Sequence, residues 1–183
     1  QDPDIIMVGE IRDRETAEIA VHSALTGHLV FSTLHTNDAP GALTRLLDMG
    51  IEPYLVASSI IGVLAQRLIR LVCRNCAQRS APEPEALREI EFSPGEEPSD
   101  VWHGQGCDRC HETGYEGRTG VFELLPVGEE VRQQILDKAS ASAIKQKAAQ
   151  HGMTTLLADG REKIRKGATT IEEVLRVSQR DEM

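Results

Sequence analysis

The fold of this 183-residue chain is decided by the stretch Asp4-Ile5-Ile6-Met7-Val8-Gly9-Glu10-Ile11-Arg12-Asp13. Its four consecutive apolar residues predict a strand that is buried on both faces of a parallel sheet. Gly9 lets the backbone turn, so that Glu10 follows at the carboxyl edge of the sheet, where open α/β folds bind ligands. A carboxylate at this edge can hold Mg2+ through water or polarise an attacking water molecule. The alternative is a plain core strand followed by a solvated Glu10.

A second strand is expected at Leu29-Val30-Phe31-Ser32-Thr33-Leu34-His35, after a helix that Asp13 caps and Gly27 ends. A strand, a helix and a strand within about 30 residues form a βαβ unit, whose two strands are parallel and whose crossover is right-handed. The chain is therefore predicted to be an α/β protein.

The direction of these strands brings three polar side chains to one edge. Glu10 and Arg12 leave the first strand where His35 leaves the second, whereas His28 enters the second strand roughly 20 Å away. An acid, a cation and a histidine at one edge suit phosphoryl transfer, through Mg2+, water positioning and charge neutralisation. The alternative is that His35 is an ordinary hydrogen-bonded residue at a strand end.

Most of the remaining chain is expected to be helical. The expected helices run from Asn37 or Asp38 to Gly50, from Pro53 through Tyr54 to about Leu68, over Glu129–Lys138 and Ser140–Gln150, from Thr154 or Thr155 to Lys166, and over Ile171–Val177. The last of these helices should open with a capping box, Thr170-Ile171-Glu172-Glu173. Residues 78–100 should form a loose excursion with one short helix, and Val121–Leu125 a short strand.

The composition excludes some classes of function. Acidic residues number 29 against 20 Lys and Arg, and a net charge of −9 argues against nucleic acid as the main partner. No segment approaches 18 consecutive apolar residues and no signal peptide is present, so a transmembrane segment is not expected. The chain lacks an initiator Met and starts almost directly on a strand pattern, so we expect a fragment of a longer protein.

The four cysteines form two C-x2-C pairs, Cys73 with Cys76 and Cys107 with Cys110, separated by about 30 residues. Each pair can aim two thiolates at one point, which suits tetrahedral Zn2+. Four thiolates leave no open position on the metal, so the predicted zinc site is structural and not catalytic. The alternative is reduced thiols without a ligand.

A loop that cradles nucleotide phosphates is missing from the sequence. The motif G-x-x-x-x-G-K-[ST] occurs nowhere in these residues. If the chain belongs to a nucleotide-hydrolysing domain, that loop must lie upstream of Gln1. The chain alone should then bind ATP very weakly and hydrolyse none.

Three motifs carry a resemblance to the secretion ATPase superfamily. Its Walker B segment resembles Gln1-Asp2-Pro3-Asp4-Ile5-Ile6-Met7-Val8-Gly9-Glu10-Ile11-Arg12-Asp13, and its His box resembles Thr26-Gly27-His28-Leu29-Val30-Phe31-Ser32-Thr33-Leu34-His35-Thr36-Asn37. The tetracysteine module of type II secretion ATPases (general secretion pathway protein E) and type IV pilus assembly ATPases is similar to Ala65-Gln66-Arg67-Leu68 with Cys73-x-x-Cys76 and Gly106-Cys107-x-x-Cys110-x-x-Thr113-Gly114-Tyr115-x-Gly117-Arg118. The resemblance covers nearly the whole chain and is weakest over residues 78–100.

The resemblance implies the C-terminal half of a RecA-like P-loop ATPase core at 1–70, an inserted tetracysteine zinc module at 71–125 and a C-terminal helical region at 126–183. It also implies that Glu10 is the Walker B acid, that His35 lies near the γ-phosphate, and that Arg12 and Thr33 contact the nucleotide. The usual acidic pair of Walker B is Gly9-Glu10 here, so one carboxylate serves both Mg2+ and the attacking water.

The whole protein implied by the resemblance is a homo-hexamer that hydrolyses ATP with Mg2+. It would act in the bacterial cytoplasm, at the cytoplasmic face of the inner membrane, on platform proteins that drive pseudopilus assembly for type II secretion. One alternative is a type IV pilus assembly ATPase, which shares every motif. Another is a non-catalytic, zinc-stabilised interaction module that docks through residues 73–125.

Overall fold

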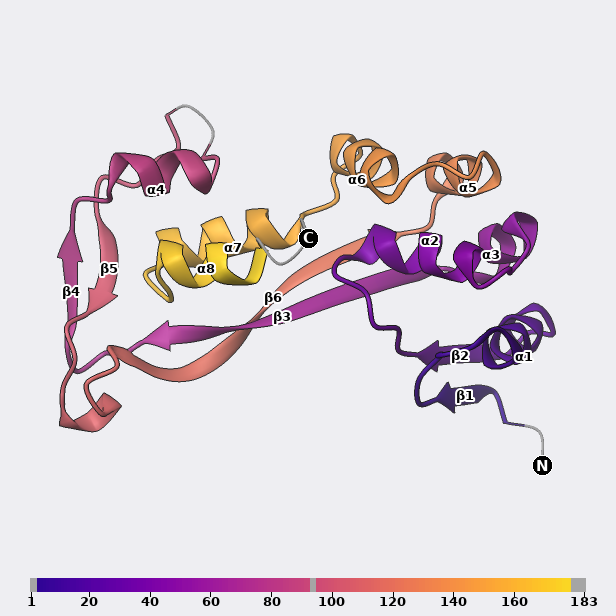
Figure 1. Ribbon diagram of the computed structural model, residues 1–183, viewed down its shortest axis with the longest axis horizontal. Coiled ribbons are helices and arrows are strands. Elements are labelled where there is room, and N and C mark those ends of the chain that lie inside the picture. Colours follow the sequence, from indigo (N-terminus) through magenta and orange to yellow (C-terminus); the bar gives the residue numbers. More distant parts are fainter. Residues whose placement is uncertain (1–2, 93–94, 179–183) are drawn as a thin grey trace. The chain divides into compact units, whose positions relative to one another are not determined.

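A computed structural model describes residues 3–92 and 95–178 (Figure 1). The chain divides into two compact units: unit 1 comprises residues up to 65 and 124–153, and unit 2 comprises residues 66–123 and those from 154 on. Strands β3 (Gly62–Val72) and β6 (Tyr115–Pro126), which are hydrogen-bonded neighbours, contribute residues to both units. None of the helices within the described ranges is long and apolar enough to cross a membrane.

Unit 1 begins with the predicted βαβ arrangement: β1 (Ile5–Val8), α1 (Arg14–Leu25) and β2 (Leu29–Ser32). The two strands are parallel, with a register that runs from Ile5 opposite Leu29 to Val8 opposite Ser32. Asp13 caps α1 by accepting a hydrogen bond from the backbone N–H of Thr16. Gly27 ends the helix at a φ of +104°, a conformation that glycine adopts without steric cost.

The prediction that β1 is buried on both faces is wrong for the described chain. Ile5 is 60% exposed and Met7 is 81% exposed, whereas Ile6 and Val8 are half-buried. The reason is that, among the described residues, this sheet has two strands, and Val8 on the other face of β1 packs against the core of unit 1. Sequence alone could not separate a strand covered on one face from a strand covered on both.

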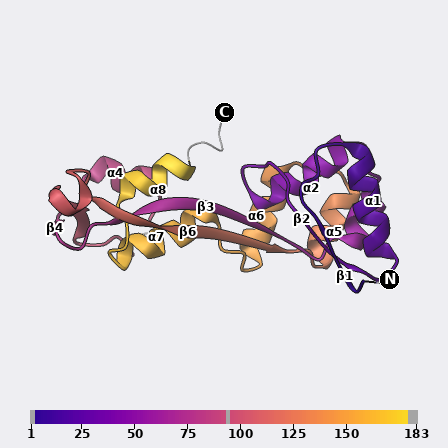
Figure 2. The ribbon, with the colours of Figure 1, turned by 90° about the horizontal axis from the view of Figure 1, so that it is seen from below.

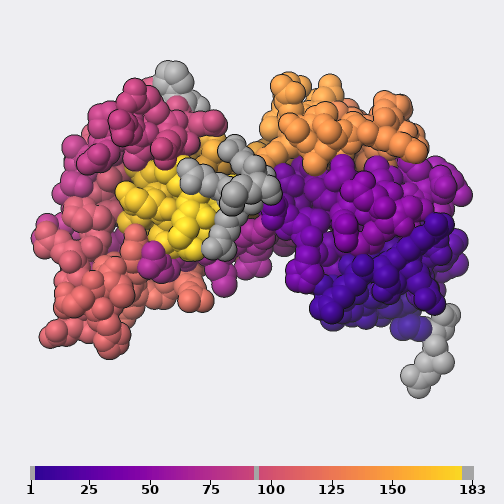
Figure 3. Space-filling model, viewed as in Figure 1, coloured from indigo at the N-terminus to yellow at the C-terminus, as the bar shows by residue number. Residues whose placement is uncertain are grey.

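The rest of unit 1 is helical: α2 (Ala39–Asp48), α3 (Pro53–Ser59), α5 (Glu129–Leu136) and α6 (Ala141–Gln150). Asp38, one of the two residues predicted to begin α2, caps it through the N–H of Gly41. Ser140, predicted as the first residue of its helix, instead caps α6 through the N–H of Ala143. In the space-filling view, the orange surface of α5 and α6 lies directly on the purple surface of α2 and α3 (Figure 3). Leu43, Val56 and Ile135 are among the fully buried residues of this core.

The predicted helix from Tyr54 to about Leu68 is wrong beyond Ser59. Helix α3 ends there, and the chain continues as β3, which runs alongside β6 (Figure 2). Along β3, half-buried residues alternate with exposed ones, of which Leu64 and Leu68 are apolar. Apolar residues on both faces of a strand mimic a helix that is apolar all round, so the periodicity could not identify the correct element. The predicted strand at Val121–Leu125 is the end of the longer β6.

Unit 2 contains β4 (Ala77–Ser80), α4 (Pro84–Glu89), β5 (Val101–Gly104), the short 3-10 helix η1 (Asp108–Cys110), α7 (Leu156–Arg165) and α8 (Ile171–Ser178). The described residues of 78–92 and 95–100 include the predicted short helix, α4, and they are more regular than predicted. Strand β4 pairs antiparallel with β5, and Ile90 and Phe92 after α4 are buried. Thr155 caps α7 as predicted. The predicted 126–183 region thus contributes α5 and α6 to unit 1 and α7 and α8 to unit 2.

Candidate functional site

A cluster of Glu10, Arg12 and His35 lies at the carboxyl ends of β1 and β2. Arg12 Nε donates a hydrogen bond of 2.6 Å to Glu10 Oε2, and His35 Nε2 contacts Glu10 Oε1. The Glu10 side chain is 21% exposed, whereas those of Arg12 and His35 are 76% and 87% exposed. The structure therefore brings together the three residues that strand direction predicted, and it leaves the side chains of Arg12 and His35 facing solvent.

The electrostatics of this cluster keep Glu10 ionised. The hydrogen bond from Arg12 holds the pKa of the Glu10 carboxyl below its usual range, against the opposing effect of partial desolvation. A carboxylate with a lowered pKa is a weak proton acceptor near neutral pH. It remains a good hydrogen-bond acceptor and a good ligand for Mg2+ or for the waters of a bound Mg2+. The arrangement is therefore better suited to holding a cation or orienting water than to removing a proton outright.

Thr33, which the sequence places at the same edge, makes hydrogen bonds within the protein. Thr33 Oγ1 donates a hydrogen bond of 2.8 Å to the carbonyl of Gly9, and the N–H of Ile11 donates to the carbonyl of Thr33 at 2.9 Å. These bonds extend the β1–β2 pairing past both strand ends and hold Glu10 between them. Contact between Thr33 and a nucleotide stays a prediction.

His28 lies at the start of β2, at the opposite end of the strand from His35. Its Nδ1 lies 3.1 Å from the carbonyl of Ser23 and 3.1 Å from Thr26 Oγ1, so the ring orders the turn around Gly27. The two histidines of this stretch thus have separate environments, as the parallel βαβ arrangement predicted.

The four cysteines converge in unit 2 from two turns. Cys73 directly follows β3, and Cys76 directly precedes β4. Cys107 directly precedes η1, and Cys110 is the last residue of η1. Their sulfurs all lie within 4.8 Å of one another, with separations of 4.0 Å for Cys73–Cys107, 3.8 Å for Cys76–Cys110 and 3.7 Å for Cys107–Cys110. A tetrahedral zinc with Zn–S bonds of ~2.3 Å requires sulfurs about 3.8 Å apart. The four thiols are free, and their arrangement fits a metal ion.

Hydrogen bonds around the cluster favour thiolate at some of its sulfurs. Asn75 Nδ2 donates to Cys107 Sγ at 3.3 Å, and this bond lowers the pKa of Cys107 to about 6. The backbone N–H groups of Cys107 and Gly114 both donate to Cys110 Sγ. Burial raises the pKa of Cys76 to about 12, so four thiolates at neutral pH require a cation among them.

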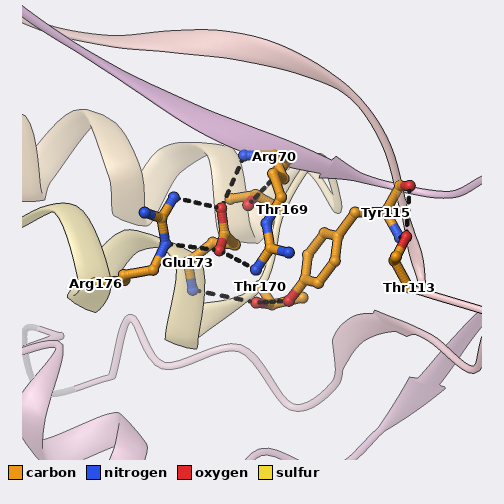
Figure 4. Close-up of polar contacts among 7 residues, drawn as sticks. All are labelled: Arg70, Thr113, Tyr115, Thr169, Thr170, Glu173 and Arg176. Carbon is orange, nitrogen blue, oxygen red and sulfur yellow. Dashed lines mark hydrogen bonds and ion pairs between the residues drawn. The ribbon is translucent and has the colours of Figure 1, made fainter.

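The sequence did not predict a second ion network, which is centred on Glu173 in unit 2 (Figure 4). This carboxylate is 1% exposed and accepts hydrogen bonds from the side chain and backbone N–H of Arg70 and from Arg176. The predicted capping box is half right: Thr170 Oγ1 accepts from the N–H of Glu173, but the Glu173 carboxylate binds arginines instead of the cap. Because Arg70 and Glu173 are 103 residues apart, no local pattern could have indicated their contact.

A profile of the family described as "Type II/IV secretion system protein" matches residues 1–176. The chain belongs to this family. Among curated relatives of this secretion family, the chain is 53% identical over 176 residues to the "Type IV pilus assembly ATPase PilB" of Thermus thermophilus, covering 96% of this chain and 20% of the relative. It is 51% identical to the "Type II secretion system protein E" of Aeromonas hydrophila, covering 99% of this chain and 36% of the relative. The chain therefore spans about a third or less of these relatives.

Two solved structures, of a pilus retraction motor and of an ATPase, share the fold of this chain. The structure of the pilus retraction motor PilT with bound ADP matches with a TM-score of 0.65 and 25% identity, over 97% of this chain and 40% of that one. The ATPase DotB of Yersinia pseudotuberculosis matches with a TM-score of 0.66 and 19% identity, over 97% of this chain and 37% of that one. The mixed α/β fold of the chain is thus that of secretion ATPases.

Proposed function

We propose that the whole protein is an ATPase that powers type II protein secretion by assembling a pseudopilus, and that this chain supplies part of its hydrolytic site. The observation that carries the proposal is the position of Glu10, between Arg12 and His35 at the carboxyl edge of two parallel strands. Relatives about half identical to this chain are named as type II secretion proteins and pilus assembly ATPases.

In the proposed mechanism, ATP with Mg2+ binds at this edge, and the phosphate-cradling loop comes from residues outside this chain. Glu10, kept ionised by Arg12, holds the metal through water or orients the attacking water. His35 and Arg12 are the exposed groups that can reach the phosphates, where positive charge stabilises the transition state. Thr33 supports the edge through Gly9 and can contact the nucleotide. The chain by itself is inactive in this proposal.

The proposed assembly is a homo-hexamer that acts in the bacterial cytoplasm, at the cytoplasmic face of the inner membrane, on membrane-bound platform proteins. We infer a RecA-like core for the whole protein. In such a core, the sheet edge that carries Glu10 would lie at the nucleotide site together with the phosphate loop from outside this chain. A type IV pilus assembly ATPase is the second candidate function, and the 53% identity to PilB favours it.

The proposed metal of the cysteine cluster is Zn2+, since four thiolates in tetrahedral spacing are the ligand set that zinc prefers. Cys73, Cys76, Cys107 and Cys110 would hold it, and no coordination position would be left for a substrate. The ion would supply structural stabilisation and no step of hydrolysis.

The test of the proposed function is Glu10→Gln in the whole protein. ATP binding should stay nearly intact while turnover falls at least ~100-fold, the scale of a lost acid–base or metal contact. The matched control is Glu15→Gln, which removes a carboxylate from the exposed start of α1 and should leave turnover unchanged. Near-normal turnover of the Glu10→Gln protein would make Glu10 an ordinary solvated residue and would remove its proposed role in hydrolysis.

A further inference from the structure

A pocket in unit 2 is lined by three arginines and one leucine: Leu68, Arg70, Arg118 and Arg176. Its volume is about 480 Å3, within the range of sites for small ligands. The arginines come from three elements, β3, β6 and α8, so the fold and not the local sequence gathers them. These arginines belong neither to the predicted nucleotide edge nor to the cysteine cluster, so neither site explains this concentration of positive charge.

Two of the three guanidinium groups are fixed in place (Figure 4). Arg70 lies over the ring of Tyr115, 4.0 Å from its centroid, and one of its terminal nitrogens donates to Glu173 Oε1 at 2.5 Å. Arg176 donates to both oxygens of Glu173, at 2.9 and 3.0 Å. These bonds use only some of the five N–H groups on each guanidinium, so the heads are oriented but retain donors for a ligand.

The third guanidinium, that of Arg118, is exposed and makes no hydrogen bond or ion pair with any residue in the described ranges. The single carboxylate of the network, Glu173, offsets one of the three positive charges. The group therefore carries two net positive charges, on a chain whose overall charge is −9. A bound dianion would complete this charge balance.

We propose that the pocket of Leu68, Arg70, Arg118 and Arg176 binds a phosphate group. A phosphate dianion matches the two excess charges, and planar guanidinium forks bind phosphate oxygens through paired N–H bonds. Orientation of Arg70 and Arg176 by Glu173 reduces the entropy lost on binding. Leu68, which is 51% exposed, offers an apolar wall beside the charge. The phosphate can come from a free phosphorylated molecule or from an anionic lipid headgroup. The proposal does not depend on Glu10 or on ATP hydrolysis.

The test measures binding of sodium pyrophosphate to the whole chain by calorimetry. It also measures binding of phosphatidylcholine vesicles with or without phosphatidic acid, whose phosphomonoester can carry two negative charges, by co-sedimentation. Arg118→Gln removes the unpaired cation and leaves the Glu173 network intact, so binding should weaken about tenfold or more. Arg118→Lys should restore part of it, since the charge returns without the fork. Arg88→Gln, the same change at an exposed arginine on α4, should have no effect.

The two probes distinguish the sources of the phosphate. Pyrophosphate binding that depends on Arg118, without preference for anionic vesicles, identifies a free phosphorylated ligand. Vesicle binding that requires phosphatidic acid and Arg118 identifies a lipid headgroup. The proposal is overturned if neither probe binds, or if Arg88→Gln weakens binding as much as Arg118→Gln does.

Discussion

Glu10 in unit 1 and Glu173 in unit 2 each lie between two basic side chains, and they differ mainly in exposure. The partners of Glu10, which are Arg12 and His35, are 76% and 87% exposed, and the carboxylate stands at a strand end. Glu173 is 1% exposed and accepts hydrogen bonds from Arg70 and Arg176, whose side chains are 43% and 46% exposed. A carboxylate between two basic side chains therefore occurs once at an open edge and once inside a core.

The difference shows how burial decides what a carboxylate can do. At the open edge, the partners of Glu10 are free to turn toward a ligand, and the ion pairs contribute little to stability because water screens them. In the core, the acceptors of Glu173 are used by arginines, so its removal leaves positive charge without compensation. We expect Glu10 to matter for turnover and Glu173 to matter for folding.

The largest expected effect is the removal of the proposed zinc from unit 2. A structural zinc contributes folding free energy directly, so chelation or Cys107→Ser should cost several kcal/mol and unfold the segment around Cys73–Gly117. The only tryptophan, Trp102 on β5, lies against Arg79 and the turn at Gly167, so its fluorescence reports this segment. Helix α1 in unit 1 should stay folded.

Elemental analysis should find one zinc per chain, and zinc added after chelation should restore the fluorescence of Trp102. Metal-free protein that is freshly purified, reduced and has native fluorescence would contradict the proposed site.

Glu173→Gln should destabilise unit 2 by about 2–3 kcal/mol, because two arginines lose their buried counter-charge but can still be partly hydrated. Glu10→Gln is the matched change at the open edge and should alter the free energy of unfolding by less than about 0.5 kcal/mol. Urea denaturation followed by Trp102 fluorescence and by far-UV circular dichroism measures both. If the two substitutions lower the free energy of unfolding equally, burial does not distinguish the two carboxylates as we infer.

Acid should destabilise unit 2 through the same carboxylate. Burial raises the pKa of Glu173, but hydrogen bonds from Arg70 and Arg176 outweigh it and lower the pKa to about 2. The unfolded value is about 4.3, so this stabilisation is complete above that pH and is lost as the pH falls toward 2. Between pH 5 and 2.5 the loss should be about 2 kcal/mol. Urea midpoints should fall less steeply with pH in Glu173→Gln, and parallel curves would disprove the assignment.

The smallest expected effects separate the two histidines. In the whole protein, His35→Ala should lower turnover about tenfold without changing stability, because this ring is 87% exposed and contacts the Glu10 carboxylate at the open edge. His28→Ala should leave turnover unchanged and cost about 1 kcal/mol, since its ring orders the turn at Gly27. Single-turnover hydrolysis at saturating ATP, with sizing of the oligomer, measures both. Slower chemistry in His28→Ala alone would show that the assignment of the two ends of β2 is wrong.

Local patterns predicted the elements whose signals lie within a few residues. Asp13 is a helix cap as expected, and Asp38 and Thr155, each one of two residues predicted to begin a helix, are caps as well. The parallel direction of β1 and β2 placed Glu10 beside His35. The strand β3 was missed because its partner β6 is about 50 residues away, and only that pairing shows that the apolar residues alternate between two faces. The Glu173 network was missed for the same reason, since contacts between distant residues leave no periodic signal.

The antiparallel register of β4 on β5, with Ala77 opposite Gly104 and Ser80 opposite Val101, brings the two cysteine pairs together. Slippage of one strand by a single residue would displace one pair of sulfurs by several ångströms, because each residue advances the chain by about 3.3 Å. A metal ion bound by one pair of cysteines would then have two thiolate ligands within bonding distance instead of four. The proposed metal would therefore favour the correctly paired hairpin over a slipped one, because only that pairing brings all four sulfurs together.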